Sequence, residues 1–505
     1  MAGIALCSVL SPLTGFAVEV SLARISGAAA PVDAYRATST VLNVGNQLFF
    51  GAVTIQVLVP LLCQSKARGL ERVGKHTTLL FGGLLFLVTL PLLYLMLAEP
   101  ERLLLVLIPK AGEQTLACGE IQLRAFACAL LPMLGAGVFG AFLQSRQIFW
   151  IAAIAQGFNN LAIATLMLFS RRADYSLAAG NLLGYTAMLA LELVYFLKLD
   201  CSGPSSWRDS WRLTIHAVRL AIPALLALVP PIVIGAVILR TLSAGPSGTL
   251  AECGFAGKPG ALVSLLPGVL FTIMLPELAL RKVTHPDAFF PMVQRVLRFA
   301  LVITIPLTSV LVVMRHPLIG ALFGGHALGL ASLDRISTYF AILAIGGPAT
   351  AVNAAMGQVC AALSDTRAGL WAICVSLAVT LAIVPQAGKH FGPGGVMFAL
   401  SATAWIICAW YATYSSVIHK VRGWLSLSLY GFKSTIVALA AAGLVAIAQS
   451  CLQNRFGASE LSDLATLAIG GVLAILTVYV VGLSLGLLEI EEIAALLRWP
   501  VARGT

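Results

Sequence analysis

Long apolar stretches, separated by short polar segments, run from one end of the chain to the other. A stretch such as 79–97 is apolar on every face of a helix and does not alternate as a barrel strand would. About 20 helical residues cross the roughly 30 Å hydrocarbon core of a bilayer, and a helix satisfies its own backbone hydrogen bonds there. The pattern therefore predicts an all-α polytopic membrane protein of about 14 transmembrane helices. They are expected near residues 3–24, 37–63, 77–98, 121–144, 149–170, 176–197, 213–239, 260–280, 297–321, 336–362, 369–388, 394–418, 431–450 and 464–488.

The composition points to the bilayer as the solvent of this chain. Of the 505 residues, 59% are hydrophobic and 10% are charged, and the mean hydropathy is +0.94. The net charge of +11 comes largely from short loops without interleaved aromatic residues, so we expect contacts with membrane lipids and not with nucleic acid. The ten cysteines are scattered singly, and neither a metal site nor a cofactor is predicted.

Basic residues are unevenly distributed between alternating loops. Lys66, Arg68, Arg281 and Lys420 belong to the loops that are richer in Lys and Arg. The positive-inside rule places these loops in the cytoplasm, and an even number of spans then places both termini there. No Lys or Arg precedes Arg24, so we expect the first apolar stretch to be a retained helix and not a cleaved signal peptide.

A weak internal repeat divides the chain. Pro60 and Pro276 each end a predicted span before a basic loop, and Gly140 and Gly357 each precede a short polar break that ends at a tryptophan. Two six-helix lobes in a pseudo-twofold arrangement account for this spacing, and such repeats place a substrate site between the halves. The predicted divisions are an N-terminal lobe (1–200), a C-terminal lobe (201–420), and two additional helices with a short cytoplasmic tail (421–505).

Several short motifs occur together in an order typical of one family. They are Gly15 to Ala17, Leu22 to Ala28, Val32 to Tyr35, Gln56 to Pro60, Gly140 to Gln144, Ile273 to Pro276, Leu297 to Phe299, Pro317 to Phe323 and Ser364 to Arg367. Over essentially its whole length the chain resembles the MurJ/MviN family of lipid II flippases, in the multidrug/oligosaccharidyl-lipid/polysaccharide exporter superfamily. The resemblance implies fourteen helices, the cytoplasmic (inner) membrane of a bacterium, and a role in peptidoglycan and cell-wall biogenesis.

The chain departs from the family at several charged positions. The family has an Arg directly after Gly-Phe-Ala, where this chain has Val18, and an Arg pair and then a Glu in helix 2, where this chain has Asn46, Gln47 and Gly51. An Asp-Arg pair at the start of helix 8 is also missing, near Ala256. In the family these cations are thought to hold the pyrophosphate of the lipid carrier. The resemblance therefore leaves open whether the cargo is lipid II or another saccharide-bearing lipid.

Charged side chains in the first two spans are candidate substrate-binding residues. An ionisable group at mid-membrane costs at least about 2.5–3.5 kcal/mol, so it usually faces protein or a water-filled cavity. Glu19 matches an acidic position of the family and is expected to face the cavity, as a gate residue or as the partner of Arg24. The alternative is a structural ion pair near the interface. Arg24 and Asp33 flank the first outer turn, as a gating pair or head-group contact, or else as a salt bridge that fixes the turn. Arg36, taken as the first residue of helix 2, is expected to reach the interface.

Three amides in helix 2 form a second candidate group. Asn43 shares a helix face with Asn46 or Gln47, and together they are too polar for a surface that faces lipid. Amides donate and accept hydrogen bonds without charge, so they suit a sugar-binding wall. The alternative is hydrogen bonding between helices, worth about 0.6–2 kcal/mol in membranes. Further buried polar candidates are Asn159, Asn160, Asn181, Glu192, Arg219, Arg240 and Glu277.

The sequence carries no signature of an enzyme. It has no phosphate-binding loop, no cluster with metal-ligand spacing and no Ser/His/Asp arrangement, so we predict a transporter driven by an ion gradient (H⁺ or Na⁺) or by the membrane potential. With the resemblance, it predicts a monomeric alternating-access flippase for a polyprenyl-diphosphate-linked saccharide, with a cavity lined by helices 1, 2, 7 and 8. The alternatives are an exporter of exopolysaccharide units, a cation-coupled exporter of amphiphiles, and a transport-inactive scaffold paralogue.

Overall fold

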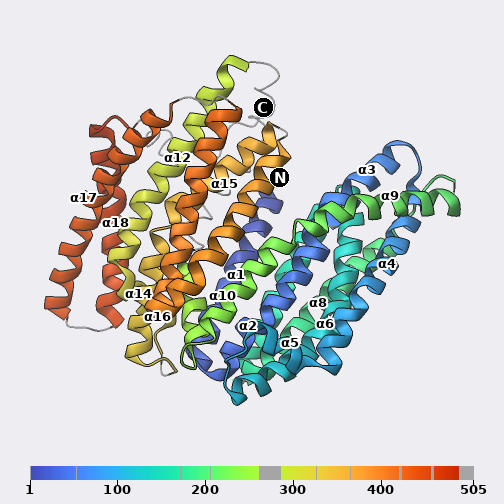
Figure 1. Cartoon of the computed structure of the whole chain (residues 1–505), viewed down its shortest axis with the longest axis horizontal. Coiled ribbons are helices and arrows are strands. Elements are labelled where there is room, and N and C mark those ends of the chain that lie inside the picture. The colour runs from blue at the N-terminus through green and yellow to red at the C-terminus, as the bar shows by residue number, and fades with distance from the viewer. Residues whose placement is uncertain are drawn as a thin grey trace. The chain divides into compact units, whose positions relative to one another are not determined.

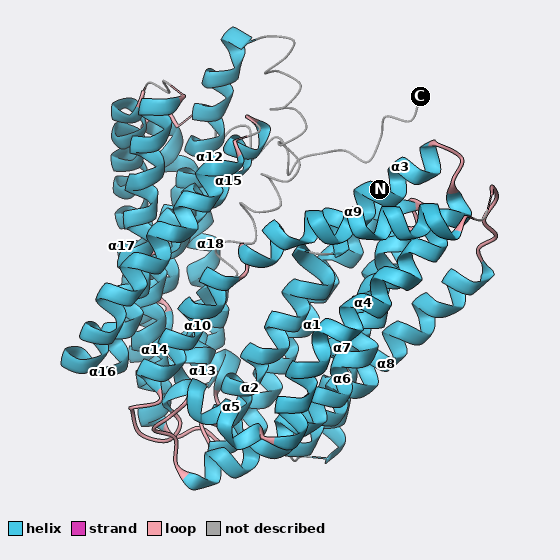
Figure 2. Ribbon diagram, turned by 45° about the vertical axis from the view of Figure 1, so that its right-hand side comes forward, coloured by secondary structure: helices cyan, strands magenta, loops and turns pink. Residues whose placement is uncertain are grey.

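A computed structural model describes residues 2–487, except 53, 171–172, 205, 261–285, 326, 364, 420–422 and 457–459. Every regular element in these residues is a helix, which confirms the predicted all-α class (Figure 2). The first helices are α1 (Ala2–Ser26), α2 (Ala30–Asn46), the π-helices η1 (Gln47–Ala52) and η2 (Thr54–Leu58), α3 (Val59–Ala67), α4 (Glu71–Ala98), α5 (Pro100–Leu107), α6 (Glu113–Ser145), α7 (Phe149–Ser170), α8 (Ala173–Lys198), α9 (Trp207–Leu226) and α10 (Val229–Leu242). A further helix begins at Thr249 and is described as far as 260. The later helices are α12 (Pro286–Val313), α13 (Arg315–Phe323), α14 (Leu330–Ala344), α15 (Gly347–Ala362), α16 (Thr366–Ile418), α17 (Trp424–Phe456) and α18 (Glu460–Ser484).

The described helices confirm a polytopic membrane protein. Eight of them are long and apolar enough to cross a bilayer, or up to nine if α14 and α15, which are bent by 44° at their junction, form one span. One of the eight, α16, is interrupted at Gly392 (φ 62°, ψ −153°), so it contains two of the predicted spans. The predicted span 260–280 lies, apart from its first residue, outside the described residues. The total of about 14 spans remains a prediction.

The first compact unit comprises Met1–Ala251 with Gly325–Leu328. Its centre is the group α6, α7 and α8, with α1 packed on α7 and α2 on α6 (Figures 1 and 2). The helices α9 and α10 also belong to this unit, because α9 packs along α4 and α10 contacts α5 and α2. This unit therefore extends beyond residue 200. The predicted six-helix lobes rest on the sequence repeat and remain a prediction.

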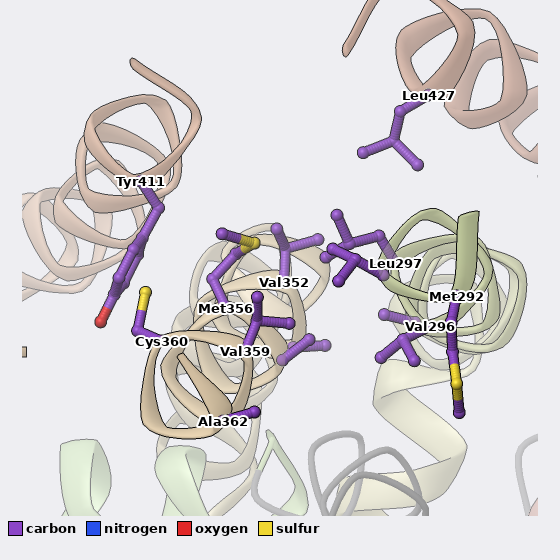
Figure 3. Close-up of a cluster of buried hydrophobic side chains, with 14 of the residues drawn as sticks. Met292, Val296, Leu297, Val352, Met356, Val359, Cys360, Ala362, Tyr411 and Leu427 are labelled. Carbon is purple, nitrogen blue, oxygen red and sulfur yellow. The ribbon is translucent and has the colours of Figure 1, made fainter. Parts of the chain in front are cut away.

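The second compact unit comprises Glu252–Gly324 with Gly329–Thr505. Its largest described core lies between α12 and α15, where Val296 and Leu297 face Val352 and Met356 (Figure 3). Tyr411 of α16 and Leu427 of α17 close the same cluster. The first of the two additional C-terminal helices thus shares a core with α12, and α18 packs on α17 and α13.

The second predicted span is an interrupted helix. After α2 ends at Asn46, the chain forms two short π-helical segments before it returns to an α-helix in α3. The widened turns fit closely against α6, because a Cβ added to Gly137 would lie 2.4 Å from the carbonyl oxygen of Phe49. Short π-helical segments are rare and occur frequently at functional sites. This one begins at Gln47, one of the candidate amides.

Candidate functional site

The carboxylate of Glu19 forms a buried ion pair with the guanidinium of Arg36. Nη1 of Arg36 lies 2.9 Å from Oε1 of Glu19, and Nη2 lies 2.5 Å from Oε2. Only 11% of the Arg36 side chain and 6% of the Glu19 side chain are exposed. Two parallel N–H···O bonds are the strong geometry for this pair of groups, so opposite charges join α1 to α2.

The expectation that Arg36 reaches the membrane interface is wrong. That expectation assumed a helix beginning near residue 36, whereas α2 begins at Ala30, with Pro31 in its first turn. Arg36 therefore lies well inside α2, at the depth of Glu19 on α1. Its pairing is the feature of this site that sequence reasoning missed, although a proline and the acidic Asp33 in the first turn are typical signals of a helix start.

Asp33 holds the start of another helix. Its Oδ2 accepts a hydrogen bond from the backbone N–H of Gly248 at 2.5 Å, and its Oδ1 accepts one from the N–H of Ala251 at 2.7 Å. These groups lie at the beginning of the helix that starts at Thr249, where backbone N–H groups have no partner within the helix. A buried carboxylate also suits the positive end of the helix dipole. Asp33 thus has a structural role, while its predicted contact with substrate remains a prediction.

Arg24 lies in the last turn of α1 and its side chain is exposed. A Cβ added to Gly325 would lie 3.8 Å from the Cα of Arg24, so the Gly325–Leu328 segment runs directly beside this turn. Arg24 is therefore placed to offer a guanidinium at the surface of the first unit, as a head-group contact requires. Its role in binding remains a prediction.

One face of α2, continued by the first residue of η1, carries a polar stripe, which we define as Arg36, Ser39, Thr40, Asn43 and Gln47. These positions follow the spacing of one helix face, and Asn43 and Gln47 are exposed. The opposite face is buried and mostly apolar. The hydroxyls of Ser39 and Thr40 donate to the carbonyl oxygen of Arg36, each at 3.1 Å. The exposed amides of Asn43 and Gln47 are polar groups that lipid does not satisfy, so in the second predicted span they favour a surface that faces water or a polar substrate.

The third candidate amide, Asn46, has a packing role. Its Oδ1 accepts a hydrogen bond of 3.0 Å from the hydroxyl of the buried Tyr185 on α8. On the same buried side, the hydroxyl of Thr38 donates to Oε1 of Gln122 on α6 at 3.0 Å, and Nε2 of Gln122 donates to the carbonyl of Pro31. These bonds fix the rotation of α2. They favour interhelical bonding for Asn46, and leave Asn43 and Gln47 as the predicted sugar-binding amides.

A polar cluster at the start of α16 lies in the second unit. The carboxylate of Asp365 caps α16 by accepting from the backbone N–H groups of Arg367 and Ala368. Its Oδ2 also lies 2.9 Å from the hydroxyl of Tyr414 and 2.8 Å from Nε2 of His419. Burial raises the pKa of Asp365, but the hydrogen bonds from Tyr414 and His419 outweigh it and hold the pKa below its ordinary value. The cluster ties the two ends of α16 together.

The next question is whether potential metal ligands lie close together. Among the described residues, no group of three or more His, Cys, Asp or Glu side chains is placed to hold a metal ion. The candidate residues of the first unit offer the hydrogen-bonding groups of amides and the exposed guanidinium of Arg24, beside the Arg36–Glu19 ion pair.

Comparison with known proteins identifies one family and its wider fold. The family model described as lipid II flippase MurJ matches residues 22–467. A Rhizobium meliloti (strain 1021) protein described as probable lipid II flippase MurJ is 24% identical over 417 residues, which are 79% of this chain and 76% of that protein.

Solved structures agree with this result. The structure of lipid II flippase MurJ in an inward closed conformation aligns with a TM-score of 0.79 and 18% identity, over 96% of this chain and 100% of that one. An inward-facing multidrug resistance transporter of the MATE family, in the MOP superfamily, aligns with a TM-score of 0.66 and 13% identity, over 82% and 96% of the two chains. At these identities the structures show a shared fold.

Proposed function

Because the chain belongs to the lipid II flippase MurJ family, we propose that it is an alternating-access flippase for a polyprenyl-diphosphate-linked saccharide, lipid II or a related cell-envelope precursor. The observation that carries this proposal is the polar stripe, which begins at the buried Arg36–Glu19 pair and continues into the second predicted span. A flippase must carry a large polar head group past a hydrocarbon core, and the uncharged amides of the stripe offer hydrogen-bond donors and acceptors along that path.

Different candidate residues suit different parts of the substrate head group. The exposed guanidinium of Arg24 suits a phosphate oxygen, and Asn43 and Gln47 suit sugar hydroxyls. Arg36 contributes little net charge to the surface, because Glu19 neutralises it. Val18 is buried, at the position where the family has an arginine. With fewer cations than the family pattern, the site places more of the recognition on the saccharide than on the pyrophosphate.

Flipping by the purified full chain tests this function. Proteoliposomes that contain fluorescent lipid II are expected to expose it on the opposite leaflet faster than protein-free vesicles do. The Arg24→Ala variant is expected to slow this step, whereas Arg102→Ala, in the exposed i,i+3 pair with Glu99, is expected to leave it unchanged. If lipid II is not moved but another polyprenyl-diphosphate saccharide is, the cargo is an exopolysaccharide unit or a related lipid. If only small cationic amphiphiles are moved, the chain is an amphiphile exporter, and if nothing is moved, it is a scaffold.

We place both termini and the loops near Arg68 and Lys420 in the cytoplasm, on the basis of the distribution of Lys and Arg. A cysteine introduced at Gly69, which is exposed, is expected to resist a membrane-impermeant maleimide in intact cells and to react after permeabilisation. A matched cysteine at Lys110, on the predicted outer side, is expected to react in intact cells. The reverse labelling pattern would invert the topology. The monomeric state is checked by light scattering of the purified protein.

A further inference from the structure

The side chain of Glu192, on the membrane-spanning α8, is fully buried, and neither Oε1 nor Oε2 has a hydrogen-bond partner among the residues that the structure describes. It differs in this respect from the other buried carboxylates of the described chain. Glu19 pairs with Arg36, Asp33 accepts two backbone N–H groups, and Glu252 pairs with Arg335 at 2.6 Å. Glu192 is thus a buried acid that neither the fold nor the proposed substrate surface uses.

The carboxyl of Glu192 is seated in an apolar contact between α6 and α8. A Cβ added to Gly140 of α6 would lie 2.9 Å from Oε1 of Glu192, so the absence of a side chain at Gly140 makes room for the acid. One helical turn further along α8, the ring of Phe196 packs against Phe139 and Phe142 of α6, at centroid distances of 4.6 and 4.9 Å. One turn in the other direction, Leu189 packs against Gly135. These neighbours offer no polar partner to a carboxylate.

Two cations on the surrounding helices have other partners. The helix α7 has no charged residue, and the cation at the end of α6, Arg146, pairs with Glu71 at 2.6 Å. On α4, Nζ of Lys75 donates to the carbonyl oxygen of Leu199 at 2.9 Å and lies 5.0 Å from the centroid of the Phe196 ring. The remaining charged groups on the helices packed against α8, and on α8 itself, are Glu19, Arg24, Asp33, Arg36, Glu113, Glu120, Arg124, Asp174 and Lys198.

We infer that Glu192 is a proton-binding site of the first unit, whose carboxyl carries a proton while α6 and α8 are packed as in this structure. Among the described residues, a bare carboxylate in this apolar contact would have neither a hydrogen-bond donor nor a counter-charge, which is strongly unfavourable, whereas the neutral acid has no charge to solvate. A proton also needs no further ligands, whereas a metal ion would require several oxygen donors that Phe and Gly side chains do not supply. Release of the proton then requires that α8 move away from Gly140 and admit water.

Infrared spectroscopy of the purified full chain in lipid nanodiscs tests for the bound proton directly, with protons as the only ligand. Exposed carboxyl groups ionise near pH 4. At neutral pH the wild type is therefore expected to retain the C=O stretch of a protonated acid, and Glu192→Gln is expected to lose that band. Glu101→Gln, which alters an exposed acid on α5, is the matched control and is expected to keep the band. A band that persists in correctly folded Glu192→Gln would overturn the assignment.

A second variant keeps the test decisive if Glu192→Gln fails to fold. Glu192→Asp retains an acid at the same contact and is expected to retain the band, and a folded aspartate variant without it would overturn the assignment. As a consequence that rests on the proposed function, the wild-type flipping rate should vary with pH, and this variation should be lost in Glu192→Gln. The two ideas fail separately. A band without flipping leaves the proton site and removes the flippase, whereas flipping without the band removes the proton site and leaves the flippase.

Discussion

Replacement of Arg36 by alanine is expected to lower the free energy of unfolding by about 3–5 kcal/mol and to reduce the amount of folded protein in the membrane. The physical reason is the charge left behind. Arg36 and Glu19 are both largely excluded from solvent, and the guanidinium donates two short hydrogen bonds to the carboxylate. Its removal therefore takes away the counter-charge that Arg36 supplies to Glu19. Thermal melting of the purified variant in detergent, followed by size-exclusion chromatography, measures the loss.

A double variant separates the loss of the pair from the loss of one charge. Buried ion pairs are often replaced by apolar residues of similar volume without cost, so Glu19→Leu combined with Arg36→Met is expected to recover most of the melting temperature. Arg102→Ala is the control for the loss of an arginine as such, because 78% of the Arg102 side chain is exposed, and it is expected to cost less than about 1 kcal/mol. Equal losses in Arg36→Ala and Arg102→Ala would show that the Arg36–Glu19 pair does not stabilise the fold.

The same double variant asks whether the ion pair also serves transport. If the pair only joins α1 to α2, the apolar replacement should flip its substrate at the wild-type rate. If Glu19 acts as a gate, the replacement should fold and yet fail to flip. The predicted role of Glu19 thus becomes measurable once stability has been recovered.

The ion pair also shows what the sequence could predict about this site and what it could not. The apolar stretches are long enough that nearly every predicted span falls on a described helix, because burial in lipid requires the same feature that the pattern measures. The predicted span begins at residue 37, later than α2, because Asp33 and Arg36 make the first turns of the helix polar. Pro31 nevertheless marks the helix start. The pairing of Arg36 with Glu19 depends on the rotation of two helices about their axes, and a single sequence does not contain that information.

Whether the other candidate side chains are buried or exposed also depends on how each helix is rotated and packed. Asn46 and Gln47 are adjacent in sequence, yet Asn46 bonds to Tyr185 inside the first unit and Gln47 is exposed. A helix places successive residues about 100° apart, so adjacent amides necessarily point in different directions. Glu192 was recognisable as a buried acid, but its lack of partners arises from the packing of α8 on Gly140, which only the three-dimensional structure shows.

Replacement of both Asn43 and Gln47 by leucine is expected to raise the KM for the lipid-linked saccharide by up to about 100-fold while leaving the protein folded. A net hydrogen bond contributes about 0.5–1.5 kcal/mol, and 1.4 kcal/mol is a factor of ten in affinity, so each amide accounts for up to about tenfold. Both side chains are exposed, and leucine in a membrane helix favours insertion, so the amount of protein in the membrane should not fall. The measurement is the initial flipping rate in proteoliposomes as a function of substrate concentration.

Gln64→Leu is the matched control for this last prediction, because it removes an exposed amide from α3, outside the polar stripe. It is expected to leave KM unchanged. If the double leucine variant also keeps the wild-type KM, the stripe does not bind the head group, and recognition must lie with Arg24 or elsewhere in the chain. If the double variant is instead lost from the membrane, Asn43 and Gln47 hold helices together and do not bind the head group. A raised KM at normal abundance is the result that only a substrate-facing stripe gives, because lost packing would reduce abundance and a lost gate would lower the maximal rate.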